Sequence, residues 1–259
     1  MSAAPFSGLY EPIPDISAYL SRIGYVGEIK NDSATLSKLM QAHLGSIPFE
    51  NLEVYFDKRE PNLTTVALFE KIVLNRRGGY CFELNGLFSR LLSSLGFSVS
   101  LFFARVVKGD FLSPPSHEVL CVETEGKRYF CDVGFGGPVP ACPIELTYDR
   151  ELVCSEGRIY RFERKGDETA LQISRDGKFS DILIFSEVPR DAVDFIPLNA
   201  FCALSPLEPF VHKAIVWKRE GIGRISIDGD IFRDGMTETK ITSRDEMFNI
   251  LRERFGMEI

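Results

Sequence analysis

The first third of the chain carries apolar residues at helical spacing. Shorter runs predict helices near 16–23, over 33–44 and after Thr64 or Thr65, with Asp15 as the cap of the first. A longer helix is predicted after Cys81. One of its faces follows the i, i+3, i+4, i+7 pattern through Leu84, Leu87, Phe88, Leu91, Leu92 and Leu95. Gly96 follows this run, at the position where a helix often ends. Residues from about 15 to 95 are therefore predicted to be helical.

From about 97 to 190 the apolar period changes to two, which is typical of strands. Gly, Pro and Asp turns separate short runs, which predict a mostly antiparallel barrel or sandwich. The runs are FSVSLFFARVV (97–107), HEVLCVE (117–123), RYFCDVG (128–134), RIYRFERK (158–165), ALQISR (170–175) and DILIFSEV (181–188).

After about residue 191 we expect an irregular stretch, then three strands and a final helix. The strand runs are AIVWKRE (214–220), GRISIDG (223–229) and DIFRDG (230–235). Ser243 and Glu246 form a capping box at the start of the final helix. The helix would bury its apolar face, made by Met247, Ile250, Leu251 and Phe255.

Composition narrows the class of protein. The 259 residues suffice for one large domain, or for two or three small ones that share a core. A net charge of −7 argues against a nucleic-acid-binding protein. No apolar run approaches the ~18 residues of a membrane span. The six cysteines have no metal-site spacing and form no CxxC pair, so we expect reduced thiols, no metal and a cytoplasmic protein.

Cys81 is the candidate nucleophile. Gly78 and Gly79 precede it and permit a tight turn with close backbone approach. At the N-terminus of the helix that follows, unpaired N–H groups and the helix dipole favour a thiolate, which predicts a lowered thiol pKa. The competing interpretation is an inert, packed cysteine, which is the usual role of a cysteine outside disulfides. A nearby base would decide between the two.

Three histidines could supply that base. His43 lies in register with Leu36, Leu39 and Met40 on an apolar helix stripe, which favours a packing role. We assign His212 to the surface or to packing. His117 differs, because it opens the alternating run HEVLCVE.

The strand after His117 predicts a partner for it. If Glu125 and Gly126 form a two-residue hairpin loop, His117 lies opposite Gly134 and Asp132 lies opposite Val119. His117 and Asp132 then share a face as diagonal neighbours, roughly 5–8 Å apart. A carboxylate there can hold the imidazole in one tautomer and stabilise its protonated form. The competing interpretation of Asp132 is an ordinary turn residue at the end of a strand.

Cys81, His117 and Asp132 together make a nucleophile, a base and an orienting carboxylate. Around them the chain resembles the arylamine N-acetyltransferase family over nearly its whole length, with motifs in the family's order and spacing. The matching motifs are IPFENL (47–52), RRGGYCFELNGLF (76–88), ARV (104–106), SHEVL (116–120) and DVGFGG (132–137).

The resemblance implies an α+β fold of three modules. These are a helical bundle over 1–96 that carries the nucleophile, an antiparallel β-barrel over 97–190 that carries His117 and Asp132, and an α/β lid with a C-terminal helix over 191–259. The first two would form a cysteine-protease-like Cys-His-Asp core. Glu50 is either a solvated loop acid or, as in the family, a buried acid that pairs with Arg76 or Arg77.

The resemblance also implies an activity. An acetyl group would pass from acetyl-CoA to Cys81 and then to an arylamine or arylhydrazine by a ping-pong mechanism, with no metal or prosthetic group, in xenobiotic metabolism. The implied CoA-contacting residues are Ser116, Gly134, Phe135, Gly136 and Phe210. Those implied for the acceptor pocket are Phe49, Val106, Phe135 and Phe210. Here Glu208 and Pro209 precede Phe210, where the family usually has a small residue.

Two other interpretations remain open at this point. A thiol hydrolase or a transglutaminase-like enzyme would use the same three residues on water or on glutamine. A non-catalytic binding module could keep the fold, although such a protein could lose Cys81 at little structural cost.

Overall fold

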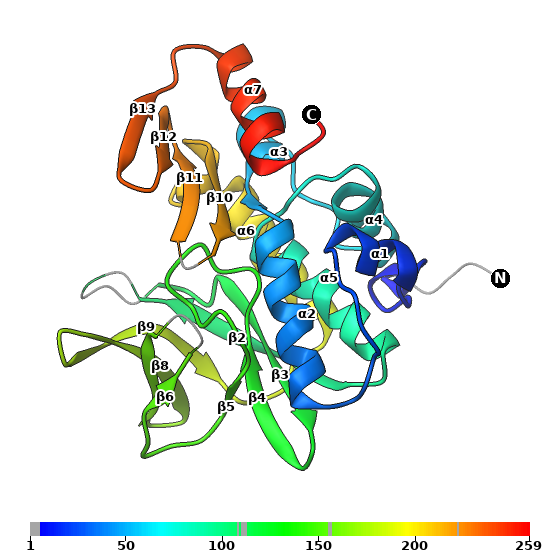
Figure 1. Ribbon diagram of the computed structural model, residues 1–259, viewed down its shortest axis with the longest axis vertical. Coiled ribbons are helices and arrows are strands. Elements are labelled where there is room, and N and C mark those ends of the chain that lie inside the picture. The colour runs from blue at the N-terminus through cyan, green and yellow to red at the C-terminus, as the bar shows by residue number, and fades with distance from the viewer. Residues whose placement is uncertain (1–5, 108, 110–112, 155–156, 222) are drawn as a thin grey trace.

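The computed structural model describes residues 6–107, 109, 113–154, 157–221 and 223–259 (Figure 1). Most of its helices come from the first third of the chain. The α-helices among the described residues are α1 (Ile16–Arg22), α2 (Ser33–Ser46), α3 (Leu52–Asp57), α4 (Thr65–Phe69), α5 (Cys81–Ser94), α6 (Ile196–Leu204) and α7 (Arg244–Phe255). None of the helices among the residues that the structure describes is long and apolar enough to cross a membrane.

The predicted starts of α1 and α7 are confirmed by their caps. Asp15 accepts a hydrogen bond from the N–H of Ala18 at 2.9 Å, and Ser243 accepts one from the N–H of Glu246 at 3.1 Å. Thr64 occupies the N-cap position of α4, where its side chain makes no capping bond. A five-residue π-helical turn, Glu70–Leu74, continues α4.

One expectation for the C-terminal part was wrong. The stretch predicted to be irregular contains a 3₁₀ turn, Ala192–Phe195, and then α6. Pro197 lies in the first turn of α6, where the missing N–H costs no intrahelical hydrogen bond.

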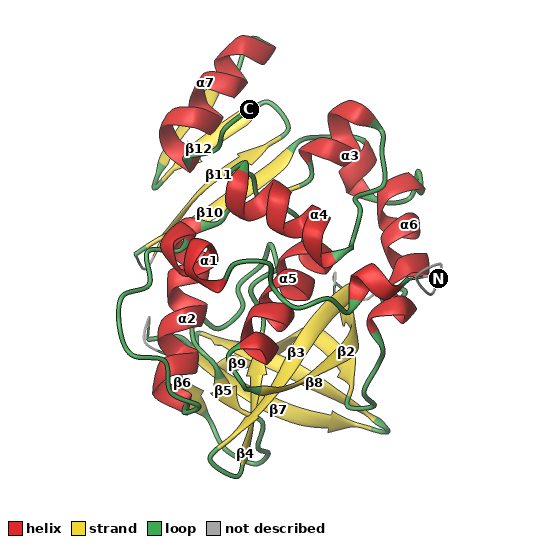
Figure 2. Ribbon diagram, turned by 90° about the vertical axis from the view of Figure 1, so that its right-hand side faces the viewer, coloured by secondary structure: helices red, strands yellow, loops and turns green. Residues whose placement is uncertain are grey.

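Among the described residues the strands form two sheets, and the ladders within them are antiparallel. The eight-stranded sheet has the order β5-β4-β3-β2-β9-β8-β7-β6 and curls into an incompletely closed barrel (Figure 2). Its strands are β2 (Ser98–Val106), β3 (His117–Thr124), β4 (Lys127–Cys131), β5 (Ile144–Glu145), β6 (Leu152–Val153), β7 (Ile159–Lys165), β8 (Glu168–Arg175) and β9 (Lys178–Ser186).

The second sheet has five strands in the order β1-β10-β11-β12-β13. Four of them follow one another near the C-terminus, and the fifth comes from the helical part. They are β1 (Phe49–Glu50), β10 (Ile215–Glu220), β11 (Gly223–Asp228), β12 (Ile231–Asp234) and β13 (Thr237–Lys240).

The hairpin predicted between β3 and β4 is confirmed with its register. Thr124 pairs with Lys127 and Leu120 with Cys131, so Glu125 and Gly126 form the two-residue loop. Both loop residues have positive φ, 52° and 70°, as a type I′ turn requires. Asp132 follows directly after the last paired residue of β4.

Three apolar clusters hold these layers together. In the largest, α5 packs against the face of the barrel sheet that carries Leu120 and Val122. The second fills the barrel itself, where the Phe185 ring contacts both Phe102 and Phe130. The third lies between the five-stranded sheet and α7. The final helix buries Met247, Leu251 and Phe255 as predicted, and Ile250 is partly buried.

The five-stranded sheet is anchored to the helical part through β1. Phe49 pairs with Trp217 and Glu50 with Val216 on one side. On the other side Phe49 bridges to Gly79, and the N–H of Glu50 donates to the carbonyl of Gly79 at 2.9 Å. Two residues therefore connect the C-terminal sheet to the turn before α5.

His43 is a packing residue, as predicted. Its imidazole is fully buried on α2, 3.0 Å from the Tyr19 hydroxyl through Nδ1 and edge-on to the Phe88 ring at 5.1 Å. Burial, with a smaller contribution from Arg22, lowers the pKa of His43 to about 3.

This burial predicts acid sensitivity. The unfolded chain protonates His43 near its ordinary pKa of 6.5 and the folded protein does not, so the stabilising contribution is present above pH 6.5 and is lost as the pH falls toward about 3. Between pH 7.5 and 5.5 we expect the unfolding free energy of the wild type to fall by about 1.4 kcal/mol relative to that of His43→Phe. Urea unfolding of both proteins at the two pH values measures this difference. The control Leu39→Ala should lower stability equally at both, and an unchanged difference for His43→Phe would contradict the assignment.

Candidate active site

Cys81 is the first residue of α5, at the end of a turn that only glycine can form. A Cβ on Gly78 would lie 2.0 Å from the carbonyl oxygen of Pro48, and one on Gly79 would lie 2.8 Å from Cβ of Glu83. Glu83 accepts the N–H of Tyr80 through Oε2 at 3.0 Å, which satisfies a donor at the helix start. The turn therefore holds Cys81 in a fixed place.

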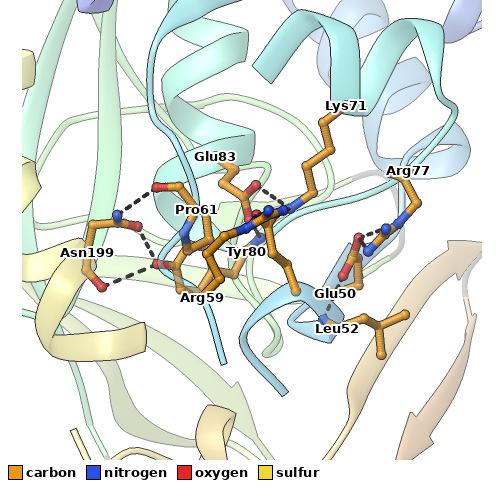
Figure 3. Close-up of polar contacts among 10 residues, drawn as sticks. Glu50, Leu52, Arg59, Pro61, Lys71, Arg77, Tyr80, Glu83 and Asn199 are labelled. Atoms are coloured by element: carbon orange, nitrogen blue, oxygen red, sulfur yellow. Dashed lines mark hydrogen bonds and ion pairs between the residues drawn. The ribbon is translucent and has the colours of Figure 1, made fainter. Parts of the chain in front are cut away.

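A buried group of charges lies beneath this turn (Figure 3). Lys71 bridges Glu83 at 2.5 Å and Glu53 at 2.8 Å. Burial raises the pKa of Glu83 to about 7 although Lys71 opposes that shift. Burial also disfavours the charge on Lys71, but the surrounding carboxylates outweigh it and raise the pKa of that ammonium. Removing one member would leave an uncompensated buried charge.

Glu50 has the structural role expected of it, and its partner is Arg77. Arg77 donates through Nε at 3.0 Å and Nη2 at 2.7 Å to Oε1 of the fully buried Glu50 carboxylate (Figure 3). The other oxygen accepts the N–H of Leu52 at 2.7 Å. Arg76 instead lies 3.6 Å from Glu258. This ion pair ties β1 to the nucleophile turn.

His117 and Asp132 lie together as the hairpin predicted. Nε2 of His117 is 2.7 Å from Oδ2 of Asp132, and both side chains are buried. The other carboxylate oxygen, Oδ1, accepts from the side chain of Asn85 and from the N–H of Gly134, each at 2.9 Å. With Asp132 oriented by two donors, Nε2 of His117 carries the proton and Nδ1 is left as the base in the neutral imidazole.

Asn85 is a site residue that the sequence interpretation missed. Besides Asp132 it donates to the carbonyl of Glu118 at 2.6 Å and accepts from the N–H of Val133 at 2.8 Å. It thereby joins α5 to β3 and to the segment that directly follows β4. Its position four residues after Cys81, on the same helix face, is the signal that could have identified it.

Cys81 meets the hairpin at Gly134 and Ser116. A Cβ on Gly134 would lie 2.7 Å from Cα of Cys81, so only glycine fits there. The thiol of Cys81 donates to the carbonyl of Ser116 at 3.8 Å, and Ser116 directly precedes His117. Cys202 on α6 donates its thiol to the same oxygen at 3.6 Å.

The predicted lowering of the thiol pKa is wrong for the protein without substrate. Cys81 is only 4% exposed. Burial raises the pKa of its thiol well above the ordinary value, with Cys202, Glu118 and Asp132 adding to the shift and the backbone N–H of Glu118 opposing it. The start of α5 does not offset the desolvation of the thiolate.

The other predicted residues fall into two groups. The Phe135 ring packs on His117 at 5.2 Å and shares the barrel cluster with Val106. Phe49 and Phe210 pack together at 6.0 Å on the side of the nucleophile turn, and Phe210 also contacts Tyr80 at 5.7 Å. His212 is exposed and stands apart, with Nε2 2.7 Å from the carbonyl of Pro206.

The carbonyl oxygen of Gly136 accepts from Arg224 at 3.3 Å. Gly136 also lies against Trp217, because a Cβ there would be 3.2 Å from the indole nitrogen. The loop from Gly134 to Gly137 therefore runs from Cys81 to the five-stranded sheet.

Comparisons with known proteins agree on one family. A family model described as N-acetyltransferase matches residues 32–259. The arylamine N-acetyltransferase of Mycolicibacterium smegmatis is 34% identical over 255 residues, which cover 95% of this chain and 92% of that protein. The solved structure of the Salmonella typhimurium arylamine N-acetyltransferase matches with a TM-score of 0.89 at 28% identity, over 96% of this chain and 93% of that one. The Mycobacterium marinum enzyme in complex with CoA matches with a TM-score of 0.86 at 30% identity, over 94% and 93% of the two chains.

Proposed function

This chain belongs to the arylamine N-acetyltransferase family, and from that membership we propose that it moves an acetyl group from acetyl-CoA to an arylamine or arylhydrazine through an acetyl-Cys81 intermediate. The observation that carries the proposal is the 2.7 Å hydrogen bond between His117 and Asp132, beside the turn that presents Cys81. It supports a base of defined tautomer near a nucleophile.

In the first half-reaction Nδ1 of His117 takes the proton of the Cys81 thiol. The sulfur attacks the thioester carbonyl of acetyl-CoA, the bond between that carbon and the CoA sulfur breaks, and the CoA thiolate takes the proton back from His117. Because burial raises the pKa of the thiol, the thiolate forms together with the imidazolium that compensates its charge. The carboxylate of Asp132 stabilises that imidazolium.

In the second half-reaction the amine nitrogen attacks the carbonyl of acetyl-Cys81. The bond between carbon and Sγ breaks, and His117 carries the amine proton back to the thiolate. The acetyl-enzyme divides one difficult transfer into two easier half-reactions. CoA leaves before the amine reacts, so ping-pong kinetics follow. CoA binding by the Mycobacterium marinum relative supports acetyl-CoA as the donor.

We further propose that Phe49, Phe135 and Phe210 form the apolar walls against which a flat amine stacks. Phe135 lies on His117, and Phe210 lies on Tyr80 next to the nucleophile. Val106 stands behind Phe135 in the barrel cluster. Ser116, Gly134 and Gly136 are proposed to contact the donor along the loop that leads away from Cys81. The three-module division, with its cysteine-protease-like core, and the cytoplasmic location remain predictions.

Mass spectrometry of the intact protein tests the intermediate. After a brief incubation with acetyl-CoA we expect a gain of one acetyl group, which peptide mapping assigns to Cys81 and which aniline discharges. The matched control is Cys202→Ser, which changes the neighbouring thiol at the Ser116 carbonyl and should acetylate normally. If neither acetyl-CoA nor another acyl-CoA labels the wild type, the proposal fails and a thiol hydrolase or transglutaminase-like reaction takes its place.

A further inference from the structure

A cleft of about 300 Å³ opens between the barrel sheet and the five-stranded sheet. In Figure 1 the lower ends of β10 and β11 approach the loops of the barrel there. We call it the arginine cleft, after four of its lining residues. The lining consists of Gly137, Pro138, Arg158, Arg175, Trp217, Arg219, Gly223 and Arg224.

The charge of the cleft is unusual for this protein. Four arginines line it, and none of the described residues that line it is acidic. The chain as a whole carries a net charge of −7. Grouping like charges is unfavourable unless an anion binds among them. Arginine is also the side chain whose planar donors best match a phosphate.

Trp217 provides a second, independent indication of a ligand. Its side chain is only 6% exposed, and its indole N–H, a donor, has no hydrogen-bond partner among the described residues. A buried donor without an acceptor is costly, so such groups mark places where a ligand or water completes the structure. This N–H lies against the loop at Gly136, where a Cβ would be 3.2 Å from the indole nitrogen.

The cleft is connected to the nucleophile along two routes. The backbone from Gly134, which touches Cys81, leads to Gly137 at the cleft. Beside it runs a row of rings: Trp217 stacks on Phe49 at 6.2 Å, and Phe49 and Phe210 lead on to Tyr80. A ligand with its reacting group at Cys81 and its phosphates in the cleft would lie along these aromatic faces.

We propose that the arginine cleft binds the phosphates of the nucleotide end of the acyl-CoA donor, with Trp217 donating to the same ligand. This inference rests on the proposed function, because it takes acyl-CoA as the donor. Arg224 already donates one N–H to Gly136, and a guanidinium has five, so it can bind a phosphate without leaving the loop. Phosphate binding by arginines fixes the donor's position and contributes nothing to the acyl chemistry.

Fluorescence titration tests the cleft directly, because Trp217 is the only tryptophan of the chain and lies in its wall. The probes are CoA, 3′-dephospho-CoA, pantetheine and inorganic phosphate. The variants are Arg175→Gln and Arg224→Gln, both at exposed positions where loss of a charge leaves folding intact. The control Arg233→Gln removes the same charge from β12, outside the cleft.

We expect the wild type to bind CoA more tightly than 3′-dephospho-CoA and much more tightly than pantetheine. Each cleft variant should raise the Kd for CoA about tenfold, as loss of a charge-assisted hydrogen bond does. The same variants should leave pantetheine binding unchanged, and Arg233→Gln should leave all affinities unchanged. In the wild type the affinity for CoA, but not for pantetheine, should fall with added salt.

Three outcomes would overturn the proposal: cleft variants that bind CoA like the wild type, variants that weaken pantetheine equally, or a cleft filled by inorganic phosphate as tightly as by CoA. S-acetylpantetheine lacks the nucleotide phosphates, so its reaction with Cys81 does not depend on the cleft. The intact mass after incubation with this donor therefore distinguishes a wrong cleft assignment from a wrong proposed function. A labelled Cys81 with arginine-independent CoA binding refutes the cleft alone. An unlabelled Cys81 with both acetyl donors refutes the function.

Discussion

Cys81→Ala is expected to abolish acetyl transfer, with kcat/KM at least about 10⁴-fold below that of the wild type. No other thiol can take its place. Cys202 is the thiol that shares the Ser116 acceptor, but it projects from α6 rather than from the first residue of α5. The measurement is the steady-state rate of arylamine acetylation together with the intact mass after incubation with acetyl-CoA.

The control variant for this prediction is Cys202→Ala, which removes the adjacent thiol and leaves the nucleophile. It should keep most of the activity. Thermal unfolding of both variants and CoA binding read from Trp217 show whether the fold is kept. Acetylation of the Cys81→Ala protein at any stoichiometric level would place the nucleophile elsewhere and refute the assignment.

Asp132→Asn is expected to lower kcat/KM about 10⁴-fold without unfolding the protein. Asn85 and the N–H of Gly134 both donate to Oδ1 of Asp132, so the new amide must direct its oxygen toward them. Its NH₂ group then faces Nε2 of His117. The imidazole must accept there, which moves its proton to Nδ1 and removes the base.

Glu118→Gln is the matched control for Asp132→Asn. Glu118 is the neighbouring buried acid on β3, and burial raises its pKa well above the ordinary value. Glutamine keeps the shape of this side chain, so the amide that replaces the acid changes little in the packing around it. Steady-state kinetics of the two variants decide: equal losses would show that any buried polar change damages the site, and a near-wild-type Asp132→Asn would refute the orienting role.

The His117–Asp132 pair could be predicted because a hairpin is a local structure. The two-residue loop at Glu125 and Gly126 fixes the register, and period-two alternation then determines which side chains share a face. The start of α5 at Cys81 was also predictable from its apolar stripe and the glycines before it. Such features depend on residues that lie near one another in the sequence.

The pKa of Cys81 could not be predicted in the same way. A thiol at a helix start has a lowered pKa when water reaches it, but α6 and the Ser116 segment cover this one. Those covering residues are distant in sequence. The arginine cleft escaped prediction for the same reason, since Arg158, Arg175 and Arg224 come from three different strand regions.

The two-residue strand β1 has a consequence for the synthesis of the protein. Phe49 and Glu50 hold the Gly79 turn on one side and need Trp217 and Val216 on the other, near the far end of the chain. A ribosome delivers the nucleophile long before it delivers that partner strand, and contacts of such sequence separation form late in folding. The active site can therefore be completed only after β10 has been synthesised. A polypeptide that stops before β10 would carry Cys81 beside a β1 strand that lacks its partners Trp217 and Val216.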